Sequence, residues 1–186
     1  MVPVTSLWIP ILLSAVIVFV VSSIIHMVLP YHRTDYRKVP AENEVMEALR
    51  KFNIPPGDYF MPRPEGPAGM KKPEFLEKMK QGPIVLMTLS PGAAPAMGKY
   101  LFQWFVYCLL VGVFAAYIAG RALGQGAPYL AVFRFAGTTA FAGYSLALFQ
   151  NSIWMRRAWS TTMKSVFDGL VYGLMTAGTF GWLWPR

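Results

Sequence analysis

The chain has 186 residues, of which 55% are hydrophobic and only 14% charged, with a mean hydropathy of +0.40. Because a soluble domain of this length is rarely so apolar, the composition argues against that class and favours an integral membrane protein. The formal net charge is +8, but no nucleic-acid recognition motif accompanies it, so binding to nucleic acid is not expected.

The first apolar segment, Leu7 to Leu29, is long enough to cross a hydrocarbon core of about 30 Å. No Lys, Arg, Asp or Glu precedes Arg33. A cleaved signal peptide would have a basic start, a shorter apolar core and a small-residue cleavage site, so residues 1–29 are expected to form an uncleaved transmembrane helix. Its many Val and Ile residues predict a peripheral helix that faces lipid or a partner, apart from the rest.

Residues 30–98 form a proline-rich loop. An amphipathic helix is predicted over 41–52, because Pro40 precedes it, acidic residues occupy its first turn and basic residues its last. A second, short helix is predicted over 74–80, where apolar residues stand beside several lysines, as in a segment resting on an anionic membrane surface.

A short apolar strand is predicted over 84–89, bracketed by Gly-Pro and Ser-Pro-Gly, with 58–61 as its pairing partner. The alternative for the same residues is a membrane-interface segment. A lone two-stranded pair is marginal in water, so the strand needs further contacts. The side chains expected to face a partner protein are Ile84, Leu86 and Leu89.

Three further spans are predicted near 100–120, 128–150 and 166–184, which gives an all-α membrane protein with four transmembrane helices. Residues 99–186 would form a three-helix bundle. Small residues recur every four positions and line faces where another helix can approach closely. They are Gly112, Ala116 and Gly120 in the second span, Thr139, Gly143 and Ala147 in the third, and Gly169, Gly173, Ala177 and Gly181 in the fourth.

The basic residues predict the orientation. All Lys and Arg except Arg121, Arg134 and Arg186 fall in or beside the 30–98 and 151–165 loops, which places these loops in the cytoplasm. Both termini are therefore expected outside, in a bacterial inner (cytoplasmic) membrane.

Two charges lie within predicted spans, Arg134 and Asp168. An ionisable residue in a span is a functional candidate by default. The favoured interpretation is structural: Arg134 reaches the outer headgroups, and Asp168 pairs with Lys164 one turn earlier.

The best polar constellation combines His26, His32 and Asp35 with three acidic residues of the following helix, Glu42, Glu44 and Glu47. Histidine and carboxylate can bind a transition metal, but no recognised metal-ligand spacing is present. Neither a metal site nor a cofactor is therefore expected, and no catalytic motif is recognised.

These features favour a non-catalytic accessory or scaffolding subunit of a larger membrane complex. Its expected partners are the lipid bilayer and other membrane-protein subunits. The first alternative is a small transporter or channel formed by a homo-oligomer, with Arg134 and Asp168 as functional charges. The second is a lipid- or quinone-modifying membrane enzyme that uses His32, Asp35 or their neighbours.

Overall fold

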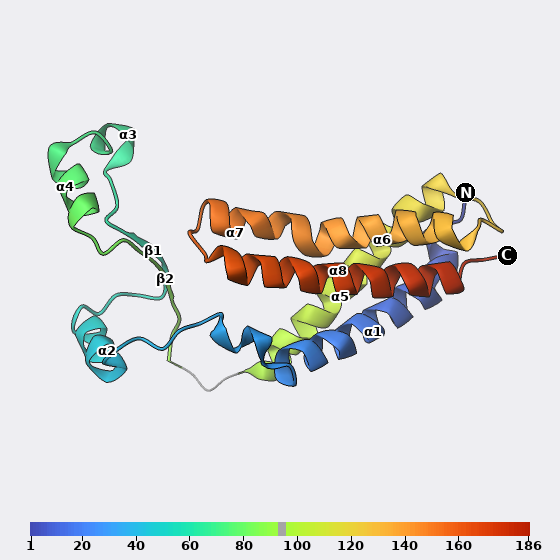
Figure 1. The fold of residues 1–186 in the computed structure, drawn as a ribbon, viewed down its shortest axis with the longest axis horizontal. Helices are drawn as coiled ribbons and strands as arrows, with labels where there is room; N and C mark the ends of the chain where they lie inside the picture. The colour runs from blue at the N-terminus through green and yellow to red at the C-terminus, as the bar shows by residue number, and fades with distance from the viewer. Residues whose placement is uncertain (93–95) are drawn as a thin grey trace. The chain divides into compact units, whose positions relative to one another are not determined.

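The computed structural model describes residues 1–92 and 96–186, and it is mostly helical, at 69% (Figure 1). The chain divides into two compact units. One, here called the helical bundle, comprises Met1–Tyr36 and Ala96–Arg186. The other, here called the loop unit, is Arg37–Pro95.

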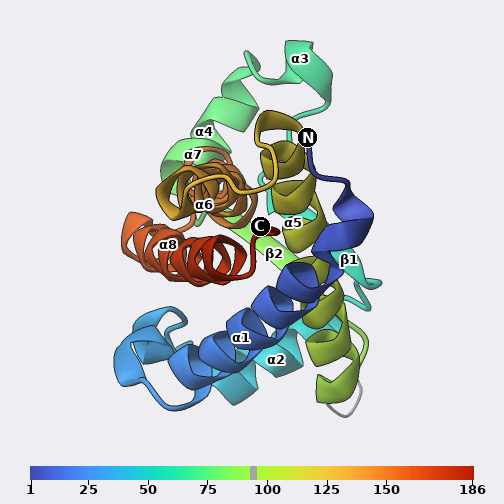
Figure 2. The ribbon, with the colours of Figure 1, turned by 90° about the vertical axis from the view of Figure 1, so that its right-hand side faces the viewer.

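Four long helices build the helical bundle: α1 (Trp8–Met27), α5 (Met97–Ala122), α6 (Tyr129–Ser145) and α8 (Trp159–Trp182). The connecting pieces are 3-10 turns at Val4–Leu7, Pro30–Thr34 and Leu146–Leu148, and the short helix α7 (Phe149–Ile153). Helix α1 packs against α5 and α8, and α6 packs against the same two helices, most extensively against α8 (Figure 2). Each long helix thus has two neighbours in the bundle.

Within the described part of the chain, two segments are long and apolar enough to cross a membrane, Val4–Met27 and α5. Helix α6 is shorter, at 17 residues. Helix α8 has 24 residues but is less apolar, because it carries Lys164, Asp168 and several threonines. Of the four predicted transmembrane helices, two are therefore present as candidates by length and composition.

The composition of α1 predicted a peripheral helix that stands apart from the others. The structure shows instead that α1 packs against α5 and α8. One face, with small residues such as Ser14, Ala15 and Ser22, is buried, and the indole Nε1 of Trp104 on α5 donates a 2.8 Å hydrogen bond to Ser22 Oγ. Of the branched residues that suggested a lipid-facing surface, Val16, Val20 and Ile24 lie on the opposite face and are exposed, whereas Val18 and Ile25 are buried.

The small residues of α8 that recur every four positions, here called the glycine ladder, face α6 along the whole length of the ladder. A Cβ added at Gly173 would lie 3.2 Å from both the Cβ and the backbone nitrogen of Phe141, so the helix backbones approach closely there. The pairs are Gly169 with Ser145, Gly173 with Phe141, Ala177 with Gly137, and Gly181 with Tyr129.

The small residues of α5 face α1 and the N-terminus. Gly112 contacts the backbone of Ile11, and the carbonyl of Gly120 accepts a 2.8 Å hydrogen bond from the Val2 amide. Ala116 is fully buried. On α6, Gly143 faces Val111 of α5, whereas the face toward α8 is built around Gly137 and Phe141 instead of the predicted Thr139 and Ala147.

Helix α8 begins seven residues before the predicted span, at Trp159. Thr161 and Thr162 are buried in its first turns, and Thr162 Oγ1 accepts a 2.7 Å hydrogen bond from Ser152 Oγ. The polar residues that suggested a loop are therefore satisfied inside the bundle. At the other end, the Gly126 amide bonds to the Pro185 carbonyl, which brings the C-terminus beside the α5–α6 loop.

The loop unit contains α2 (Glu42–Lys51), β1 (Gly57–Met61), α3 (Gly66–Gly69), α4 (Pro73–Gln81) and β2 (Val85–Leu89). The predicted pairing is confirmed: β1 and β2 are antiparallel, with Tyr59 opposite Met87. Helix α4 starts at Pro73 and ends at Gln81, and it is capped by Gly82, whose φ of +60° favours glycine. Among the described residues of this unit, only Gly69 is buried.

Candidate functional site

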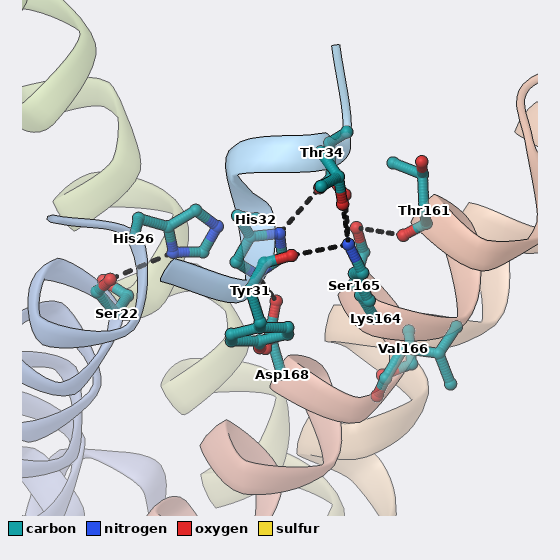
Figure 3. Close-up of polar contacts among 12 residues, drawn as sticks. Ser22, His26, Tyr31, His32, Thr34, Thr161, Lys164, Ser165, Val166 and Asp168 are labelled. Carbon is teal, nitrogen blue, oxygen red and sulfur yellow. Dashed lines mark hydrogen bonds and ion pairs between the residues drawn. The ribbon is translucent and has the colours of Figure 1, made fainter. Parts of the chain in front are cut away.

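A group of polar side chains, here called the His–Asp cluster, lies at the end of the helical bundle away from both termini (Figures 1 and 3). It comprises His26, Tyr31, His32, Asp35, Lys164 and Asp168. Helix α1 supplies the first residue, the Pro30–Thr34 turn and its C-cap the next three, and α8 the last two. Because a 3-10 turn begins at Pro30, shortly after α1 ends at Met27, the chain folds back and presents Tyr31 and His32 to α8.

His32 lies between two carboxylates. Its Nδ1 is 2.7 Å from Asp35 Oδ2, and its Nε2 is 2.8 Å from Asp168 Oδ2. Ionised carboxylates only accept hydrogen bonds, so both ring nitrogens must carry hydrogen when both acids are ionised. In that state His32 is an imidazolium that bridges the turn after α1 to helix α8.

Asp168 is buried, at 2% exposure, and both of its carboxylate oxygens have partners. The Tyr31 hydroxyl donates to Oδ1, while His32 contacts Oδ2. The predicted pairing of Asp168 with Lys164 is wrong, because Lys164 points to the 30–35 segment instead. A buried carboxylate is costly unless it is paired and hydrogen-bonded, and here the partners come from the turn after α1.

Lys164 fixes the 30–35 segment from the other side. Its Nζ donates to the Tyr31 carbonyl at 2.5 Å, to Thr34 Oγ1 at 2.9 Å and to Asp35 Oδ1 at 2.9 Å. Burial alone would raise the pKa of the Asp35 carboxyl, but hydrogen bonds from His32 and Lys164, together with their charges, hold that pKa below its ordinary value. Asp35 is therefore ionised near neutral pH.

The His26 ring stacks on His32, with ring centroids 4.4 Å apart and planes within 10°. Its Nδ1 is 3.0 Å from the Ser22 carbonyl oxygen. A carbonyl only accepts, so this contact requires hydrogen on Nδ1 and leaves Nε2 with the free lone pair in the neutral ring. His26, His32 and Asp168 each offer one metal-ligating atom, and these atoms lie within 4.8 Å of one another.

Two apolar features adjoin the His–Asp cluster. Trp104, Tyr107, Tyr144 and Tyr172 form an aromatic cluster between α5, α6 and α8, in which the buried Tyr172 hydroxyl has no hydrogen-bond partner among the described residues. Beside His26, a groove of about 510 Å³ opens between α1 and the start of α5. It is lined by Ser22, Ser23, His26, Met27, Met97, Leu101 and Trp104.

The remaining predicted site residues lie elsewhere. Arg134 is exposed on α6 and makes no ion pair within the described part of the chain. Tyr144, on the same helix, packs beside Gly169, the residue that follows Asp168. Arg134 lies ten residues before Tyr144, which is about 15 Å along the helix, so it is far from Asp168. Glu42, Glu44 and Glu47 are exposed on α2 of the loop unit, and Ile84, Leu86 and Leu89 lie on or beside β2.

Sequence reasoning singled out His26, His32 and Asp35 as one group and Asp168 as a separate intramembrane charge. The structure joins them, across 136 residues between His32 and Asp168. It also adds Tyr31, for which only the aromatic character of the segment after α1 gave a signal. Lys164, predicted as the partner of Asp168, instead donates to the 30–35 segment. Comparisons with protein-family models, with curated proteins and with solved structures found no match to this chain.

Proposed function

We propose that the chain is a four-span integral membrane protein in which α1, α5, α6 and α8 all cross the bilayer. The exposed side of α8 supports this. From Met163 onward its outward residues are apolar, whereas Thr162, Asp168 and Thr176 are buried and Lys164 is half-buried. Asp168 and the buried threonines, which lower the hydropathy of α8, thus face the bundle interior, and Lys164 lies at the polar end of the helix, an arrangement suited to lipid. The outward apolar residues are Met163, Phe167, Leu170, Leu174, Met175 and Trp182.

Helix α6 reaches a spanning length together with the two short elements after it. The 3-10 turn Leu146–Leu148 and α7 continue the helical path of α6 to Ile153, and about 20 residues suffice to cross the hydrocarbon core. Exposed apolar residues on this path include Leu130, Phe135 and Leu146.

The distribution of charge supports placing both termini outside a bacterial inner membrane. Backbone hydrogen bonds from Val2 to Gly120 and from Gly126 to Pro185 gather both termini and the α5–α6 loop at one end of the bundle. The lysine-rich and arginine-rich segments leave from the opposite end. By the positive-inside rule this second end is cytoplasmic, and the His–Asp cluster then lies at the cytoplasmic surface.

Within that membrane the protein acts as an accessory or scaffolding subunit of a larger complex. The observation that carries this function is the absence of a core in the described part of the loop unit, where no hydrophobic side chain is buried. Two strands and short helices cannot offset the entropy of ordering without buried apolar area. Apolar side chains left exposed for a partner include Val45, Met46, Phe52, Met61, Leu76 and Leu86.

The experiment is purification of the tagged full chain in a gentle detergent, with identification of the proteins that co-purify. Foreign subunits are expected, and Leu86→Lys should release them while the helices stay inserted, because it places an unpaired charge in an apolar contact. Gln81→Lys adds the same charge at an exposed polar position and should keep the complex. Purification of the chain alone, or as a homo-oligomer only, would contradict the accessory function.

A second candidate function is a membrane enzyme that acts on a lipid or quinone. It is favoured by the position of the His–Asp cluster beside the apolar groove. The groove would bind the apolar part of an amphipathic molecule, and the cluster would contact its polar end. A retained lipid or quinone, detected by native mass spectrometry and lost in Leu101→Trp, would support it. No corresponding observation favours the transporter, since Arg134 stands apart from Asp168.

A further inference from the structure

We propose that His26, His32 and Asp168 bind a divalent transition-metal ion such as Zn²⁺. The inference is independent of the accessory function, because it rests only on residues of the helical bundle. These three residues come from α1, from the turn that follows it and from α8, and their ligating atoms lie within 4.8 Å of one another (Figure 3). Two imidazoles and a carboxylate are a donor set used for zinc and for iron.

Binding an ion would require the ligand atoms to move from their positions in the structure. With metal–ligand bonds of about 2.0–2.1 Å, ligand atoms in a tetrahedral site lie about 3.3 Å apart. The His32 Nε2 and Asp168 Oδ2 atoms, at 2.8 Å, would have to separate by about 0.5 Å to reach this tetrahedral value. The widest pair involves His26, the exposed member of the three, and would close by about 1.5 Å to reach the same tetrahedral value.

Each histidine ligand has a hydrogen-bond acceptor at its second ring nitrogen, as metal-binding histidines usually do. A ligating histidine usually donates its second ring nitrogen to a carboxylate or a carbonyl, which fixes the tautomer and the ring orientation. His32 Nδ1 is 2.7 Å from Asp35 Oδ2, and His26 Nδ1 is 3.0 Å from the Ser22 carbonyl. In both rings this arrangement leaves Nε2 for the ion once the proton on His32 Nε2 is displaced.

The carboxylate ligand is held in the same way. The Tyr31 hydroxyl donates to Asp168 Oδ1, so Oδ2, the oxygen beside His32, is the one left for the ion. Asp168 is buried and its α8 backbone is fixed by the close contact of Gly169 with Ser145. The three ligands therefore stand on elements that the fold already holds together, and they leave one position of a tetrahedral ion to a ligand other than these three side chains.

The test uses the full chain in detergent, purified through a tag that contains no histidine and stripped with a chelator. Zn²⁺ binding is measured by calorimetry, and Co²⁺ serves as a spectroscopic probe of coordination geometry. One ion per chain is expected, with the absorption of a low-coordinate Co²⁺ site. Asp35→Asn, which removes the carboxylate behind His32 and also the charge that pairs with Lys164, should weaken binding 10- to 100-fold.

His26→Ala and Asp168→Asn should abolish binding. His26 is exposed and its only polar contact in the described structure is to its own helix, so its replacement leaves the bundle intact even if Asp168→Asn impairs folding. Ser23→Ala, in the same groove but without a ligand atom at the site, is the matched control and should bind as the wild type does. Absence of binding in the wild type, or equal binding by His26→Ala, would overturn the proposal.

Discussion

Replacing Gly173 by leucine tests whether the close approach of α8 to α6 holds the helical bundle together. A Cβ at this position would lie 3.2–3.3 Å from the Cβ, amide nitrogen and Cα of Phe141. Two of these three atoms are backbone, so they cannot move aside as a side chain can. Overpacking a well-packed site costs about 1–3 kcal/mol. Because leucine has three more heavy atoms beyond the Cβ, we expect a loss at the upper end of that range.

That loss is measured as the change in the free energy of unfolding in detergent micelles, or as the fraction of monodisperse protein after heating. Gly178→Leu is the control, because a Cβ at Gly178 would meet only the Tyr129 hydroxyl, at 3.8 Å. The gain in helix propensity from replacing glycine, about 1 kcal/mol, applies equally to both variants. If the two substitutions reduce stability by the same amount, the packing argument for the glycine ladder fails.

Three further substitutions have distinct expected effects. Asp35→Asn should loosen the segment after α1, because charge-assisted hydrogen bonds of about 1.5–3 kcal/mol each are lost. Faster tryptic cleavage at Arg33 would report this loosening, and unchanged cleavage would contradict the role given to Asp35. Trp104→Phe should reduce stability by about 1 kcal/mol through loss of the hydrogen bond to Ser22, and no change in thermal unfolding would argue against that contact. Arg134→Gln should alter stability by less than about 0.5 kcal/mol, since the side chain is exposed without an ion pair in the described structure; a larger loss would show a partner for Arg134.

The local elements follow closely from the sequence. Hydropathy and the spacing of proline and glycine predict the helix at Glu42–Lys51 and the strand at Val85–Leu89 to within about a residue or two. The four-residue spacing of small side chains also predicts a close-packing face on α8, since such spacing has few other physical reasons. These features depend on neighbours in the chain, which the sequence displays directly.

The positions of α1 and of the His–Asp cluster depend on contacts between distant segments. The composition of α1 predicts its exposed apolar face but gives no sign of the buried face that contains Ser14, Ala15 and Ser22. Likewise, a spacing rule favours Lys164 as the partner of Asp168, because the two are one turn apart. In the structure Asp168 is paired by tertiary contacts instead, because Tyr31 and His32 reach it from the turn after α1. No local sequence pattern predicts that this turn lies beside Asp168.

The measurement that tests the four-span proposal most directly is thiol labelling of intact cells with an impermeant reagent. The single native cysteine, Cys108, is buried in α5 and is first replaced by serine. With four spans, a cysteine at Gln125 is labelled, whereas one at Arg157 is shielded until the membrane is permeabilised. If only α1 and α5 crossed the bilayer, residues 125 and 157 would lie on the same side, so equal labelling of both positions would contradict the proposal.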